Sequence, residues 1–158
     1  QCNCGAKGCL EQYASVTGMV RTAVEGIEQG KRTLLTDMCG GDVERIDGKM
    51  ISDAHARGDE FAGWVINETG IWLGTAVGSM INLLNPEMVV FCGGMIAAGE
   101  TLFAPIRETA KAQSFEVPYN RTVIVPAGLG ADSGVIGAAG GALQRYEEET
   151  KGTRVGKV

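Results

Sequence analysis

The sequence has a single histidine, His55, and no serine or acid stands in a spacing that would make it part of a hydrolytic triad. No pair of carboxylates stands out for acid–base catalysis either. No apolar run approaches the length needed to cross a bilayer, and the N-terminus lacks a signal-peptide pattern. The lack of a long apolar run predicts no membrane contact. Without a catalytic partner, His55 is expected to be an exposed helix residue.

Basic residues are also scarce, and Lys31 and Arg32 form the only adjacent basic pair. The net charge is −5, which would repel a nucleic-acid backbone except at a local basic patch. We therefore expect no nucleic-acid contact from this segment. The 158 residues suit one domain, and 44% hydrophobic residues are enough to bury a core.

Five cysteines are present, an odd number, and three of them are crowded near the N-terminus. A disulfide framework is typical of small secreted domains, and nothing else in the chain indicates secretion. The pattern therefore predicts a reducing compartment and a cytoplasmic protein.

Hydrophobic periodicity predicts most of the secondary structure. Helices are expected over residues 10–27, 50–56, 60–84, 99–113 and from Asp132 or Ser133 to 148, with Pro105 in the first turn of its helix. Residues 88–92 and 122–125 are expected to be fully buried strands. Residues 33–49 should form a loop or short-helix region, 117–120 a turn, and 149–158 a frayed tail. This order predicts an α/β fold with parallel strands joined by a crossover.

Three glycines stand four residues apart in the long predicted helix, at Gly70, Gly74 and Gly78. Each costs a helix about 1 kcal/mol relative to alanine. Close packing of another backbone against this face is the preferred explanation, ahead of ligand contact.

The first candidate site is the segment Cys2-x-Cys4-Gly5-x-x-Gly8-Cys9. Three thiols with glycines that let the loop fold back resemble a metal knuckle, and zinc takes thiolates readily. Three ordinary buried thiols are the alternative, and the spacing favours metal. Glu11 follows at a helix start, where its chemistry alone indicates helix capping.

Two glycine-rich loops form the second candidate site. Gly93-Gly94 follows the first predicted strand, and Gly128-x-Gly130-x-x-x-Gly134 follows the second. Ligands bind at the carboxyl ends of strands in open α/β sheets. Neither loop is a Walker A motif, but together they predict a nucleotide site. Asp132 is the only acid within these two glycine loops, and capping of the following helix is its simpler role.

These three features, in this order, resemble the ROK family, named for repressors, open reading frames and kinases. The resemblance runs from Cys2 to about Leu143, and it is carried by residues 2–11, 83–94 and 129–139. Bacterial glucokinases are the most similar members. The resemblance implies a ribonuclease H-like, actin/hexokinase-type ATPase fold, with residues 1–158 as an incomplete C-terminal lobe. Residues 1–11 would form a zinc and sugar segment, and residues 86–148 the nucleotide side.

The resemblance also implies roles for individual residues. Cys2, Cys4 and Cys9 would hold structural Zn²⁺, and Glu11 would bind sugar hydroxyls, which reverses the preference for capping. Gly93, Gly94, Gly130, Asp132 and Gly134 would bind ATP, which acts with Mg²⁺. The implied function is ATP-dependent phosphorylation of a hexose by a homodimer or homo-oligomer.

Two of the family's motifs are absent from the sequence. The phosphate-binding Asp-x-Gly-x-Thr motif and the catalytic aspartate are not found, and a Glu-x-Gly-His segment with the zinc histidine is expected just before Gln1. We therefore expect this chain alone to be inactive, with an uncovered sheet edge. A sugar-sensing domain of a ROK repressor and a stand-alone zinc-knuckle module are the alternative functions.

Overall fold

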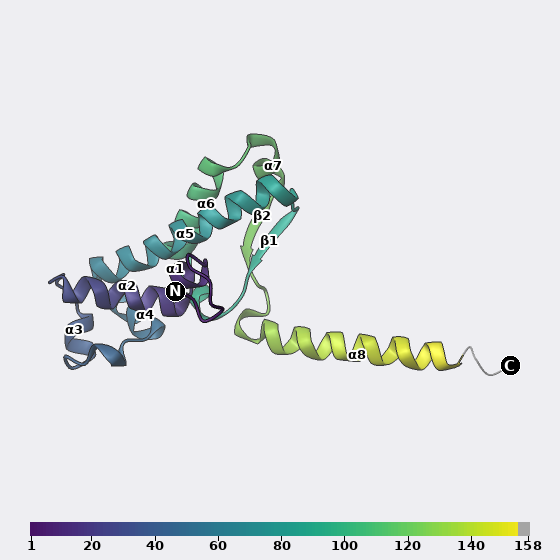
Figure 1. Cartoon of the computed structure of the whole chain (residues 1–158), viewed down its shortest axis with the longest axis horizontal. Coiled ribbons are helices and arrows are strands. Elements are labelled where there is room, and N and C mark those ends of the chain that lie inside the picture. Colours follow the sequence, from purple (N-terminus) through teal and green to yellow (C-terminus); the bar gives the residue numbers. More distant parts are fainter. Residues whose placement is uncertain (155–158) are drawn as a thin grey trace.

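The computed structural model describes residues 1–154, and describes side-chain surroundings for all of these except residues 131 and 151–154. The N-terminal half is helical, and the C-terminal half adds two strands (Figure 1). The elements are α1 (Glu11–Ala14), α2 (Val16–Glu28), α3 (Leu35–Met38), η1 (Val43–Arg45), α4 (Gly48–Ala56), α5 (Glu60–Leu84), β1 (Met88–Phe91), η2 (Gly94–Ala98), α6 (Glu100–Gln113), α7 (Glu116–Arg121), β2 (Val123–Pro126), η3 (Gly130–Asp132) and α8 (Ser133–Arg154).

The single helix predicted over residues 10–27 is wrong, because the chain breaks at Ser15. Ser15 has extended backbone angles, and its side-chain oxygen accepts a hydrogen bond from the Gly18 N–H at 3.1 Å. Serine at this position satisfies an N–H group at the start of α2 that has no partner within the helix. The apolar spacing continues across the break, which is why periodicity alone misses it.

Helix α5 spans the predicted residues 60–84 and forms the centre of the core. Asp59 caps its N-terminus, and Asn85 ends it in the left-handed region with φ of 46°. Proline at position 86 disfavours a helical conformation at Asn85. The buried face of α5 contributes about 1.5–3 kcal/mol for each large aliphatic side chain, and these side chains are Val65, Ile66, Leu73, Val77 and Ile81.

Helix α6 packs along α5 with close backbone approach, as the three glycines predict. A Cβ added at Gly70 would lie 2.6 Å from Pro105 Cγ, and one at Gly74 would lie 2.7 Å from the Ile106 carbonyl oxygen. Tight helix packing is thus confirmed as the role of these glycines. The placement of Pro105 in the first turn is wrong, since it lies in the second turn of α6, where its buried ring packs against Gly70.

The two strands are parallel, as predicted, and Phe91 is paired with Pro126 at their carboxyl ends. Their full burial is a wrong prediction, because helices cover only one face of the sheet. Ile124 is buried, while Met88, Val90 and Val123 on the other face are each at least half exposed. The described part of the chain supplies no further strand to this sheet, so the expected uncovered edge is present.

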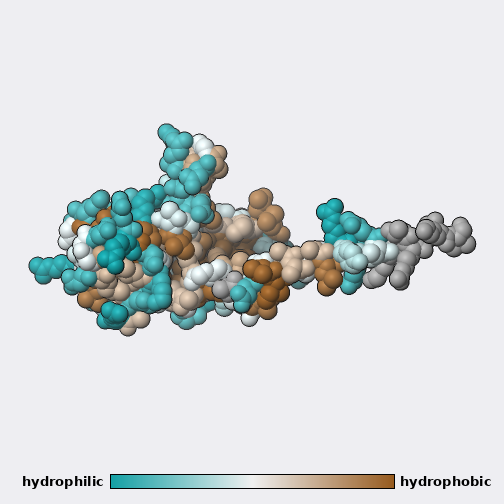
Figure 2. Space-filling model, turned by 90° about the horizontal axis from the view of Figure 1, so that it is seen from below, coloured by the Kyte–Doolittle hydropathy of each residue, from teal (hydrophilic) through white to brown (hydrophobic). Residues whose placement is uncertain are grey.

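Two predictions in the C-terminal region are also wrong. The turn expected at residues 117–120 lies within the short helix α7. The tail expected from Glu149 is helical through Arg154, because α8 continues without interruption, and residues 155–158 lie outside the described residues. Helix α8 extends away from the body (Figure 1). Figure 2 shows hydrophobic surface where α8 leaves the body, over exposed residues that include Leu129, Val135 and Ile136.

None of the helices in the described part of the chain combines the length and the apolarity that a bilayer crossing requires.

Candidate functional site

The three N-terminal cysteines lie together, as the sequence predicts. Their sulfur atoms are all within 4.8 Å of one another, and the Sγ atoms of Cys4 and Cys9 are 3.5 Å apart. Zinc bound by thiolates at about 2.3 Å in a tetrahedron places its sulfur ligands about 3.8 Å apart. The donor set therefore fits zinc with three of four ligands.

Tight turns in the loop bring the cysteines together. Gly5 and Gly8 have φ of 88° and 75°, a backbone conformation that side chains rarely adopt. The Cys2 N–H donates to the Ala6 carbonyl at 2.8 Å, and the Gly5 N–H donates to the Cys2 carbonyl at 2.9 Å. The two glycines thus have a structural role, which is to fold eight residues around the thiols.

The thiols of the cluster are electrostatically distinct. The pKa of Cys2 is lowered, first by a hydrogen bond from the Cys4 backbone N–H and then by the Cys4 side chain, with a smaller contribution from the Gln12 side chain. The pKa of Cys9 is raised, mainly because it shares hydrogen bonds with the thiols of Cys4 and Cys2. Of these two thiols, Cys2 therefore forms a thiolate more readily than Cys9.

Glu11 is the first residue of α1, two residues beyond Cys9, and its side chain is exposed. The Gln12 N–H donates to the Cys9 carbonyl at 2.9 Å, so α1 continues directly from the thiol loop. This connection places the backbone of Glu11 directly beyond the cluster, with its exposed side chain on the first turn of α1.

The prediction that His55 is an exposed helix residue is wrong. Its ring is half-buried, and Nε2 lies 3.0 Å from the Thr101 hydroxyl of α6. A Cβ at Gly63 would lie 2.8 Å from His55 Nδ1, so this glycine makes room for the ring. His55 joins α4 to α5 and α6, an interaction that its position on a polar helix does not indicate.

The two glycine loops leave the sheet at the same end, as predicted, and η2 and η3 are in contact. Gly93 and Gly130 have φ of 105° and 56°, and no atom would obstruct a side chain at Gly94 or Gly134. Asp132 is exposed directly before α8, while the Ser133 hydroxyl donates to the Gly130 carbonyl at 2.6 Å. The five loop residues therefore form an open surface around the η2–η3 contact.

A cavity of about 620 Å³ lies beside the first glycine loop. Its walls come from η2, α2, α4 and the first turn of α6, and they are mostly apolar; they include Gly94, Met95, Ala98, Met19 and Ser52. This volume is in the range of small-molecule sites. Sequence reasoning found Gly94 but missed the α4 wall, because no local motif indicates which helix will face the loop.

Comparison with known proteins identifies the family, because the sequence profile of the ROK family matches residues 1–145. The chain belongs to the ROK family. A glucokinase from Halalkalibacterium halodurans is 37% identical over 152 residues, which cover 94% of this chain and 44% of that protein.

Two solved structures of ROK proteins are also similar. A ROK family glucokinase from Streptomyces griseus, in complex with glucose and AMPPNP, is 31% identical with a TM-score of 0.78, and the match covers 87% of this chain and 45% of that one. A ROK family transcriptional regulator, a homologue of the Escherichia coli MLC protein, is 33% identical with a TM-score of 0.66, over 79% and 30% of the two chains. The chain thus spans less than half the length of these relatives.

Proposed function

We propose that the chain is part of an ATP-dependent hexose kinase of the glucokinase type. The observation that carries this proposal is the match to glucokinases over most of the chain, together with two glycine loops that meet beside a cavity. Residues 1–11 form its metal and sugar segment, and residues 86–148 its nucleotide side. We further propose that it works in the cytoplasm as a homodimer or homo-oligomer.

Zn²⁺ is the metal proposed for Cys2, Cys4 and Cys9, with a structural role. The inter-sulfur distances support this assignment, and the Glu11 carboxylate next to the cluster would accept hydrogen bonds from sugar hydroxyls. In the chemistry of a kinase, zinc would shape the site without taking part in phosphoryl transfer.

ATP is the proposed nucleotide. Its phosphates would lie against Gly93, Gly94, Gly130, Asp132 and Gly134, and its flat aromatic base would enter the cavity beside Gly94. Mg²⁺ commonly binds through substrate phosphates with few protein ligands, and it would arrive with ATP. The exposed carboxylate of Asp132 stands at the same loop.

Metal analysis tests the zinc assignment. The chain purified with Zn²⁺ should retain up to one equivalent, and replacement of Cys2, Cys4 and Cys9 by serine should remove it. Cys92→Ser is the matched control, because this thiol is exposed and outside the cluster. Unchanged zinc content in the triple variant would contradict the assignment.

Titration calorimetry with AMPPNP tests the nucleotide site. Ala97→Trp places a large side chain at the cavity wall and should weaken binding at least tenfold, because the base would be excluded. Ala138→Trp on the exposed face of α8 is the control and should bind normally. Equal affinity for both variants would show that the cavity is not used.

The purified chain should consume no ATP in a glucose-dependent manner. The sequence contains no Asp-x-Gly-x-Thr motif, and phosphoryl transfer needs positioned phosphates, a metal ion and an oriented nucleophile. A coupled assay with glucose and ATP checks this, and measurable turnover above a no-sugar control would refute it.

A sugar-sensing domain of a transcriptional repressor is the second candidate, supported by the match to the ROK transcriptional regulator. The same calorimetry separates the two functions. A kinase segment should bind AMPPNP in the cavity, whereas a sensing domain should bind sugar without a nucleotide requirement. The glucokinase match extends over more of both chains, so the kinase is preferred.

A further inference from the structure

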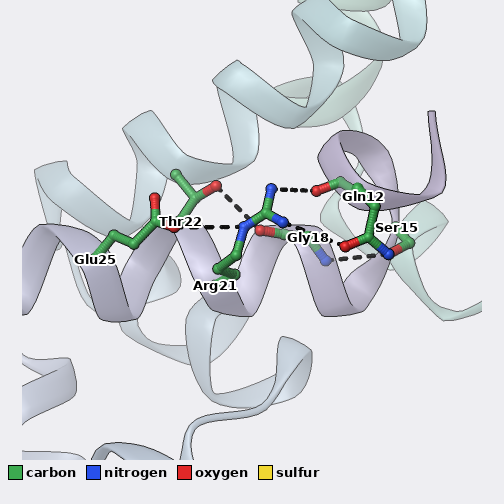
Figure 3. A network of polar contacts seen from close by, with 6 residues as sticks. All are labelled: Gln12, Ser15, Gly18, Arg21, Thr22 and Glu25. Carbon is green, nitrogen blue, oxygen red and sulfur yellow. Dashed lines mark hydrogen bonds and ion pairs between the residues drawn. The ribbon is translucent and has the colours of Figure 1, made fainter. Parts of the chain in front are cut away.

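Arg21 of α2 reaches back across the Ser15 corner to α1, where it contacts a single residue twice (Figure 3). Its Nη2 donates to the Gln12 backbone carbonyl, and its Nη1 donates to the Gln12 side-chain oxygen at 3.3 Å. The guanidinium also lies 5.8 Å from the Tyr13 ring centroid, and its Nε is 3.5 Å from a Glu25 carboxylate oxygen. Four contacts with three residues, Gln12, Tyr13 and Glu25, therefore hold the planar guanidinium in one orientation.

The backbone of α1 passes unusually close to α2 at the same residue. A Cβ added at Gly18 would lie 2.8 Å from the Gln12 carbonyl oxygen and 3.0 Å from its carbonyl carbon. The Gln12 carbonyl is near the end of a helix of four residues, so it has no partner within α1. Arg21 supplies the missing donor, and Gly18 leaves the space in which the two helices meet.

Gln12 in turn connects this corner to the thiol cluster. Its N–H donates to the Cys9 carbonyl at 2.9 Å. Because guanidinium N–H groups can only donate, Arg21 binds the two oxygens of Gln12, one on its backbone and one on its side chain. Gln12 also directly follows Glu11 along the chain.

The cluster depends on such support because its loop is largely exposed and α1 is short. A helix of four residues has no stability of its own in water. Ala14 is buried and Tyr13 packs on Trp72 with ring centroids 4.8 Å apart, but neither contact reaches the thiols. Gln12 is the residue of α1 that bonds both to Arg21 in the body of the domain and to Cys9 in the thiol loop.

We propose that Arg21, acting through Gln12, is a positioning residue that holds the thiol cluster and Glu11 against the body of the domain. The effect expected on metal binding rests on the proposed metal function, because residues that orient the ligands of a metal tune the affinity for that metal. The ion pair with Glu25 is exposed and contributes little by itself. The hydrogen bonds to Gln12 carry the positioning.

Cobalt(II) titration followed by competition with Zn²⁺ tests the proposal on the whole chain. Arg21→Ala should weaken metal affinity about 10- to 100-fold, which is the usual effect of removing a residue that orients the ligands of a metal. Arg21→Lys should recover only part of this loss, because one ammonium group cannot hold both Gln12 oxygens. Gln12→Ala should also weaken binding, because Arg21 then keeps only the backbone carbonyl at position 12 as its acceptor on α1.

Arg107→Ala is the matched control. Arg107 also pairs with a carboxylate, Glu100, and lies 5.8 Å from the Phe103 ring centroid, but it belongs to α6. Circular dichroism should show both alanine variants to be folded. Equal metal affinity for Arg21→Ala, Arg107→Ala and the unsubstituted chain would overturn the proposal.

Amide hydrogen exchange in the metal-free chain provides a readout independent of metal. Arg21→Ala should speed exchange at the Gln12, Tyr13 and Ala14 N–H groups at least tenfold, because α1 loses its clamp. Unchanged exchange rates would overturn the proposal that Arg21 holds α1 in place, even if metal affinity fell. Absence of cobalt binding by the unsubstituted chain would instead refute the metal function, and exchange would then decide the clamp alone.

Discussion

Asp59 shows how one buried side chain organises two segments. It is only 7% exposed, and its carboxylate accepts hydrogen bonds from the Ala62 N–H at 2.8 Å, from the Thr33 hydroxyl at 2.7 Å and from the Leu34 N–H. It thereby caps α5 and fixes the chain that enters α3. Burial, the largest influence, acts to raise its pKa, but these hydrogen bonds together outweigh burial and lower the pKa below 3.8.

Replacing Asp59 by alanine should lower the free energy of unfolding by about 2 kcal/mol, because three donors lose their acceptor. Asp59→Asn should cost less at neutral pH, since an amide keeps one acceptor oxygen. Urea denaturation at pH 7 measures both changes. A loss for Asp59→Ala no larger than that for the exposed Asp37→Ala would contradict this role.

The lowered pKa of Asp59 also predicts a pH dependence. A carboxylate whose folded pKa lies below its unfolded value stabilises the fold fully above the unfolded pKa of about 3.9. This contribution is lost as the pH falls through the folded pKa. The stability difference between the unsubstituted chain and Asp59→Asn should therefore be constant from pH 6 to 7 and shrink below about pH 4. Urea denaturation across this range would contradict the prediction if the difference grew on acidification.

At the scale of elements, the glycine face of α5 is predicted to pack closely against another backbone, and the structure shows that this backbone is α6. Three glycines at a spacing of four create a flat surface on α5, and α6 presents Pro105, Ile106 and Thr109 to it. Their cost in helix propensity is offset by backbone packing that a methyl group would prevent.

Gly74→Ala should lower the free energy of unfolding by about 1–3 kcal/mol. The added Cβ would lie 2.7 Å from both the Ile106 carbonyl oxygen and Thr109 Cβ, and this clash exceeds the gain of about 1 kcal/mol in helix propensity. Gly140→Ala in α8 is the control, because nothing lies within 4 Å of its added Cβ. Thermal unfolding should separate the two variants, and a stabilising Gly74→Ala would contradict the packing account.

At the scale of the whole molecule, two apolar surfaces lack cover in the described part of the chain. One is the open face of the sheet at Met88, Val90 and Val123, and the other follows the start of α8 (Figure 2). Leu83 at the end of α5 and Phe115 before α7 are exposed as well, with exposed fractions of 82% and 71%. Exposed apolar area of this kind and an unpaired strand edge favour association.

The purified chain should therefore self-associate, and Val90→Lys should reduce its average mass in light scattering. A charge on the open face makes its burial against another molecule costly. Thr17→Lys adds the same charge on exposed α2, away from the sheet, and should not change association. An unchanged average mass for Val90→Lys would show that the open face is not the surface used.

Several features were determined by the sequence alone. The bounds of α5 follow from a long apolar stripe between Asp59 and Asn85-Pro86, and the thiol cluster follows from glycines that allow a tight loop between cysteines close in sequence. Parallel pairing and the meeting of the glycine loops follow from the order of strands and helices. All of these depend on local spacing or on topology, which the order of residues carries directly.

Other features were decided only by tertiary structure. Whether a strand is buried depends on what covers its second face, so the apolar runs at β1 and β2 could not reveal that this face is open. The position of His55 against Thr101, the α4 wall of the cavity and the reach of Arg21 to Gln12 join residues from different elements. These contacts arise from how the helices pack. The pattern of apolar residues indicates which face of a helix is buried, but not which residues of another element that face will contact. The sequence alone thus predicted that the three thiols lie together and that the glycine loops meet, while packing determined what holds and surrounds them.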